Sequence, residues 1–182
     1  FERFLRRPPA DVDVLLMEGT TIGRSASETK PKSEQDLDQD FMDQIRKAKG
    51  MVLVWTSAQN IDRLVTLFKA CKTSGRQLIL DMYTAEILRV TGNPKLPQGT
   101  WKGVRVFLPE SQKRQIKSQR LFRIAKPYGD SRIYSEQLAE EASRSVMLFR
   151  PSMRGDLEKA GCLQDATLIY SLWPGYLKQE QQ

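Results

Sequence analysis

The feature that most constrains the fold is an alternation of short apolar runs with longer amphipathic segments. Each run has the length of a buried strand, roughly four to eight residues. The runs cover residues 12–17, 51–55, 77–81, 104–108, 145–149 and 166–171. Strands that are apolar almost throughout and alternate with helices indicate a sheet covered on both faces. We therefore predict an α/β fold, a three-layer sandwich with a mostly parallel sheet.

Helical patterns lie between most of these runs. The two longest, residues 33–50 and 58–75, both end at a glycine, as helices often do. In the second, apolar side chains recur at the spacing of one helix face. Shorter or more polar helices are predicted at residues 83–92, 111–120, 133–143 and 152–161, and the Gly- and Pro-containing stretch 92–103 is predicted to be a loop.

Composition limits the class of protein. A chain of 182 residues is long enough for one well-buried core, and no apolar run approaches the roughly 20 residues that span a bilayer. We therefore expect no membrane partner. The start of the chain is charged and does not look like a signal peptide.

The two cysteines, Cys71 and Cys162, are far apart, which favours a reducing cytoplasm, and Cys71 is expected in the core. Because the chain begins with Phe1, we expect it to be part of a longer protein.

The net charge of +7 is compatible with a nucleic-acid partner. The basic residues are spread along the chain, however, and a solvated, soluble surface would look the same. Residues 111–120 are most simply an exposed basic helix, and an RNA-facing strip is the alternative.

Polar side chains follow several of the predicted strands. Open parallel sheets bind ligands at the carboxyl ends of their strands, and a helix that begins there can hold a phosphate. Serine and threonine at helix starts are more often simple caps, and an acid after a buried strand more often accepts nearby backbone N–H groups. The residues in these places are Glu18 after the first run, Ser57, Asn60 and Arg63 after the second, Asp81 after the third, and Arg150 and Ser152 after the fifth.

Two motifs are distinctive. The helix start after the second run, followed by a Gly-Arg pair, contains Ser57, Asn60, Ile61, Arg63, Gly75 and Arg76. The first apolar run ends in Glu18, Gly19 and Thr20. With these motifs, the sequence from about residue 12 to about residue 176 resembles the β-CASP branch of the metallo-β-lactamase superfamily, which includes ribonuclease J and the pre-mRNA cleavage endonucleases.

The resemblance implies a function for the intact parent protein. Members of this branch hydrolyse phosphodiesters at a two-zinc site between a metallo-β-lactamase domain and the inserted β-CASP domain. Residues 1–24 would be a flanking segment of the first domain, and residues 25–182 would be the β-CASP domain. The family's zinc ligands are largely histidines, and this chain has none, so we expect no metal site and no activity in the chain alone.

The resemblance also assigns roles to residues. Glu18 would be a catalytic acid that hydrogen-bonds a histidine on the leaving-group side of the metal site. Ser57, Asn60 and Arg63 would contact an RNA phosphate. Arg150 and Ser152 lie where family members usually have a glycine-rich turn, but arginine can still hold a phosphate there.

The predicted parent is thus a metal-dependent ribonuclease or related hydrolase. Its expected partners are single-stranded RNA and the missing metallo-β-lactamase domain, and a homodimer is left open. The alternative is a non-catalytic α/β module for binding or for protein interaction.

Overall fold

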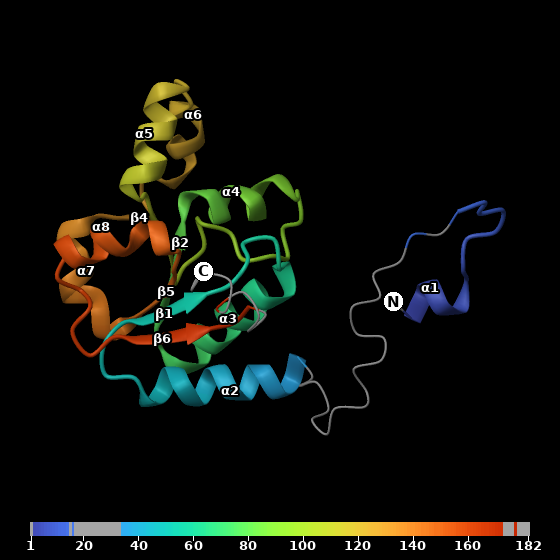
Figure 1. Ribbon diagram of the computed structural model, residues 1–182, viewed down its shortest axis with the longest axis horizontal. Coiled ribbons are helices and arrows are strands. Elements are labelled where there is room, and N and C mark those ends of the chain that lie inside the picture. Colours follow the sequence, from blue (N-terminus) through green and yellow to red (C-terminus); the bar gives the residue numbers. More distant parts are fainter. Residues whose placement is uncertain (1, 15, 17–33, 173–176, 178–182) are drawn as a thin grey trace. The chain divides into compact units, whose positions relative to one another are not determined.

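The computed structural model describes residues 2–14, 16, 34–172 and 177 (Figure 1). Its contacts divide the chain into two compact units, Phe1–Lys32 and Ser33–Gln182, which we describe separately. The assignment of residues 1–24 to a flanking segment of a metallo-β-lactamase domain and of residues 25–182 to a β-CASP domain remains a prediction. No helix in the described part of the chain is both long and apolar enough to cross a membrane.

The described residues of the first unit include a short helix, α1 (Glu2–Arg6), which the sequence pattern did not predict. The predicted strand at residues 12–17 is wrong at its described positions, which form no strand. Their apolar side chains are exposed, by 48% at Val12, 75% at Val14 and 91% at Leu16. A strand is stable only when neighbouring strands supply hydrogen bonds and packing, and an apolar run alone does not provide them.

The second unit contains a six-stranded sheet in the order β4-β3-β2-β5-β1-β6. Every neighbouring pair is parallel, so the predicted parallel sheet is confirmed. The strands are β1 (Val52–Trp55), β2 (Gln77–Asp81), β3 (Val104–Phe107), β4 (Arg132–Ile133), β5 (Ser145–Leu148) and β6 (Thr167–Tyr170). Five of them coincide with predicted runs. The two-residue β4 was missed because it is too short to show a pattern.

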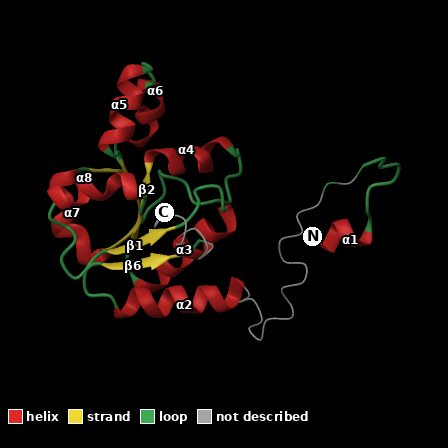
Figure 2. Cartoon of the chain, viewed as in Figure 1, coloured by secondary structure: helices red, strands yellow, loops and turns green. Residues whose placement is uncertain are grey.

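Helices cover both faces of this sheet, which confirms the three-layer α/β sandwich (Figure 2). Side chains alternate along each strand, so Leu78 and Leu80 belong to one core cluster and Ile79 to the other. The first face packs against α2 (Glu34–Lys47), α3 (Ile61–Ser74) and α4 (Met82–Val90), and the second against α7 (Ser135–Glu141) and α8 (Arg154–Lys159).

A further helical pair, α5 (Glu110–Ser118) and α6 (Phe122–Ala125), stands out from the rest of the domain (Figure 1). Short 3-10 turns complete the unit: η2 (Lys126–Tyr128), η3 (Ala142–Arg144) and η4 (Pro151–Met153). Residues 92–103 contain no helix or strand, as predicted.

The connections create a switch point in the sheet. The chain leaves β2 into α4 on one face, whereas it leaves the neighbouring β5 through η4 into α8 on the other face. In open parallel sheets, ligands bind at the carboxyl ends of strands where the connections diverge in this way. The switch point therefore indicates a candidate ligand site at the carboxyl ends of β2 and β5.

Both cysteines are buried, with Cys71 only 1% exposed, which confirms its place in the core. Burial raises the pKa of the Cys71 thiol to about 12 and also raises that of Cys162. At pH 8, a pKa of about 12 instead of 9.0 lowers the thiolate fraction about 10³-fold.

We therefore expect neither thiol to react with Ellman's reagent within minutes in the folded protein, and both to react at once in 6 M guanidinium chloride. The release of the yellow thiolate at 412 nm measures this. Rapid stoichiometric labelling of the native chain at pH 8 would show that the core around α3 opens readily.

Candidate functional site

The site at the switch point is built around Asp81, the last residue of β2, whose side chain is fully buried. Its Oδ1 accepts the backbone N–H of Thr84 at 3.1 Å and the side-chain amide of Gln112 at 3.0 Å. Its Oδ2 accepts the Thr84 hydroxyl at 2.8 Å and Nε of Arg150 at 3.1 Å. The expectation that Asp81 accepts backbone N–H groups is confirmed, and it also caps α4.

Arg150 lies directly after β5 and is the cationic partner of this acid. Its Nε donates to Asp81, its Nη2 donates to the Thr84 hydroxyl at 3.3 Å, and its guanidinium lies 5.1 Å from the centre of the Tyr83 ring. The side chain is 31% exposed. Its Nη1 makes no hydrogen bond within the part of the chain that the structure describes. Arg150 is thus fixed on one side and open to solvent on the other.

Ser57 and Asn60 lie after β1, and both are exposed. The Ser57 hydroxyl accepts the backbone N–H of Gln59 at 3.2 Å, and the Asn60 carbonyl oxygen Oδ1 caps α3 by accepting the backbone N–H of Arg63 at 3.1 Å. Asn60 is therefore the cap of α3, and Ser57 only bonds the turn that precedes the helix.

The Arg63 side chain contacts other elements of the fold. Its Nη1 donates to the hydroxyl of Ser171, just after β6, and its guanidinium lies 5.6 Å from the centre of the Phe41 ring on α2. The Thr56 hydroxyl donates to the backbone oxygen of Ser171 at 3.3 Å. These contacts hold α3 against α2 and the end of β6.

Ser152 is exposed in η4. It does not cap α8, because a 3-10 turn intervenes and α8 begins only at Arg154, with no side-chain cap.

All these residues lie at the carboxyl edge of the sheet, but in two groups. Arg150 is hydrogen-bonded to Asp81 and Thr84, whereas Arg63 is hydrogen-bonded to Ser171. Aromatic residues lie at the carboxyl ends of β1, β5 and β6. The Trp55 ring meets Phe149 edge-on at 6.1 Å and Tyr170 edge-on at 5.3 Å, so Trp55 packs against its neighbours.

Sequence reasoning missed three members of the site, namely Tyr83, Thr84 and Gln112. Thr84 lies three residues after Asp81, which is the spacing of an N-cap, so the local sequence contained a signal for it. Gln112 lies 31 residues from Asp81, and nothing in the local sequence connects the two. Glu18, together with Gly19 and Thr20, lies outside the described residues.

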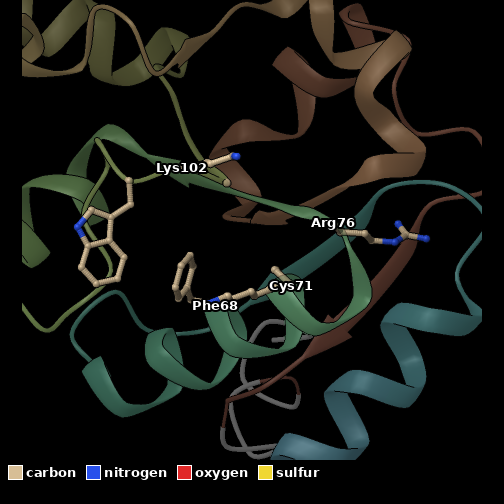
Figure 3. Close-up of a pocket in the computed structure, with 7 residues that line it drawn as sticks. Phe68, Cys71, Arg76 and Lys102 are labelled. Atoms are coloured by element: carbon tan, nitrogen blue, oxygen red, sulfur yellow. The ribbon is translucent and has the colours of Figure 1, made fainter.

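A pocket of about 570 Å³ lies at the opposite end of the strands, before β2 and β3 (Figure 3). Phe68, Cys71 and Trp101 line it, but the Arg76 guanidinium points away from Phe68. Arg76 instead donates to the backbone oxygens of Gly50, at 2.8 Å, and Ala48. Lys72 and Lys102 also border the pocket, and no acid or hydroxyl side chain among the described residues lines it.

The described residues do not fit a zinc site. They contain no group of three or more His, Cys, Asp or Glu side chains placed to hold a metal ion. The two thiols are buried and their pKa values are raised, which opposes the thiolate that zinc requires.

No protein-family model matches the sequence, and a search of curated proteins gives no significant match.

Proposed function

We propose that this chain forms one wall of the substrate cleft of a zinc-dependent metallo-β-lactamase/β-CASP ribonuclease, and that its carboxyl edge holds phosphates of single-stranded RNA. The motif resemblance supports the family. The observation that carries the binding role is Arg150, which is oriented by Asp81 and Thr84 and stacked on Tyr83 while part of its guanidinium faces solvent.

The chemistry of this arrangement suits a phosphodiester. A guanidinium is always charged and presents N–H donors in a fork that matches two phosphate oxygens. Because Arg150 is already held in place, it loses little conformational freedom when it binds. Asp81 is fully buried, so solvent meets the cation and not the anion of the pair.

In this proposal the chain is inactive alone. Hydrolysis belongs to the parent's zinc site, which would lie outside the described residues, and Glu18 keeps the catalytic role that the resemblance gives it. The compartment would be the cytoplasm.

RNA binding tests the proposal. We expect the chain to bind a fluorescein-labelled 20-nucleotide oligouridine, with an affinity that falls steeply as salt increases from 50 to 200 mM. Replacing Arg150 with alanine should weaken binding about 10-fold at low salt, the effect of losing about 1.4 kcal/mol from one bidentate contact. Fluorescence polarisation measures both effects.

Arg144→Ala is the matched control. Arg144 is exposed and paired with Glu141, and it precedes the same strand that Arg150 follows. Equal losses of RNA affinity in the two variants would mean that binding depends only on the net charge of the chain. If the folded chain binds no RNA at all, the result would favour the non-catalytic protein-interaction module.

A further inference from the structure

The α5–α6 pair carries most of the chain's excess charge. We call residues 110–126 the basic arm. Within residues 113–126 there are six cations and no acid, so this stretch supplies six of the net +7 charges and leaves +1 for the rest of the chain. The six are Lys113, Arg114, Lys117, Arg120, Arg123 and Lys126, and all are exposed.

Apart from Phe122, the arm turns its apolar side chains inward. Ile116 is 9% exposed, and Leu121, Ile124 and Ala125 pack against the same core cluster. Lys113 forms an exposed ion pair with Glu110 at 3.4 Å. The other five cations form no ion pair with any residue that the structure describes. The arm therefore exposes six cations with little internal neutralisation.

Arg120 occupies a position that favours glycine. Its φ is 55°, in the left-handed region, where it follows the end of α5. The Leu121 N–H donates to the Ile116 oxygen at 2.9 Å and closes the turn. Glycine adopts this conformation without steric cost, whereas an arginine does not. Replacing Arg120 with glycine therefore removes the side chain without weakening the turn.

The arm begins at the site described above. Gln112, in the first turn of α5, donates to Asp81 and accepts the backbone N–H of Tyr83 at 3.2 Å. The Tyr83 ring is 44% exposed, and Phe122 at the start of α6 is 61% exposed. Cations interleaved with exposed aromatic rings suit a nucleic-acid strand, because phosphates pair with the former and bases stack on the latter.

We propose that the basic arm is a second RNA-binding surface that holds the backbone of a strand as it leaves the carboxyl edge. The choice of RNA rests on the function proposed above. A membrane is a weaker partner, since the apolar side chains of the arm, except Phe122, are at least partly buried and offer no insertion face.

The test combines Arg114→Gln, Lys117→Gln and Arg120→Gly in the 182-residue chain. This arm variant should weaken binding of the 20-nucleotide oligouridine at least about 10-fold. It should also reduce the slope of log affinity against log salt by about 2, since each phosphate contact on a single strand contributes about 0.7. A 6-nucleotide oligouridine should lose less affinity, because it is too short to occupy both surfaces.

The control variant combines Lys72→Gln, Arg144→Gln and Lys159→Gln, three exposed cations outside the arm. Equal losses in the two triple variants would overturn the proposal. Unchanged affinity in the arm variant, with a loss in Arg150→Ala, would overturn the arm while leaving the proposed function intact. Binding of phosphatidylserine vesicles or polyglutamate through the arm, without RNA binding, would overturn both.

The single variant Arg120→Gly separates function from folding. It should melt at the same or a higher temperature and still bind the longer RNA more weakly. A variant that binds RNA normally would show that the Arg120 side chain has no part in binding.

Discussion

Replacing Asp81 with alanine is expected to lower the free energy of unfolding by about 3 kcal/mol. The carboxylate is fully buried and accepts four hydrogen bonds, from Thr84 twice, from Gln112 and from Arg150. Its loss removes the cap of α4, worth about 1 kcal/mol, and leaves the other donors without their acceptor. Arg150 is 31% exposed and can gain water, which keeps the cost at the lower end for a broken ion pair.

Urea unfolding followed by circular dichroism measures this effect. Asp62→Ala is the matched control, because Asp62 is an exposed acid in the first turn of α3, and its loss should change stability by less than about 0.5 kcal/mol. The free energy of unfolding of Asp81→Asn should lie between those of the two alanine variants, since asparagine keeps an acceptor oxygen but loses the charge. If the free energies of unfolding of Asp81→Ala and of the control differ by less than about 0.5 kcal/mol, the network around Asp81 adds little to the stability of the fold.

The strands were predictable where burial on both faces leaves a continuous apolar run. Leu78, Ile79 and Leu80 are each fully buried, although they face alternate sides of the sheet. The same signal failed at residues 12–14 and 16, because an apolar run does not say whether a neighbouring strand is present. The cap at Asp81 was predictable for a similar local reason, because this residue bonds a backbone N–H three residues ahead.

Predicting the site would have required the strand order, which no local sequence pattern contains. Asp81 and Arg150 are 69 residues apart and meet only because β2 lies beside β5. Arg63 depends on tertiary contacts in the same way, although the local sequence placed it correctly near a helix start. Its side chain nevertheless bonds Ser171, 108 residues away, and packs over Phe41. Residues were thus identified by position along the chain, but their partners were set by tertiary contacts.

The same dependence on tertiary contacts governs Gly50, which precedes β1. A Cβ atom there would lie 2.5 Å from the backbone oxygen of Gln164 and 2.7 Å from the carbonyl carbon and oxygen of Asp165. The Gly50 N–H also donates to the Asp165 oxygen at 3.2 Å, just before β6 pairs with β1. Backbone atoms cannot move aside as a flexible side chain can, so a methyl group would push the start of β6 away from β1.

We expect Gly50→Ala to lower the free energy of unfolding by about 3 kcal/mol, the upper range for overpacking, as measured by urea unfolding. Gly155→Ala is the matched control. Gly155 lies within α8, and a Cβ atom there would have nothing within 4 Å. That variant should gain about 0.5–1 kcal/mol from helix propensity. Opposite signs for the same chemical change would locate the close approach of the two chain segments at Gly50. Equal and small effects would mean that the start of β6 shifts at little cost, so that the β1–β6 pairing is not rigid at that end.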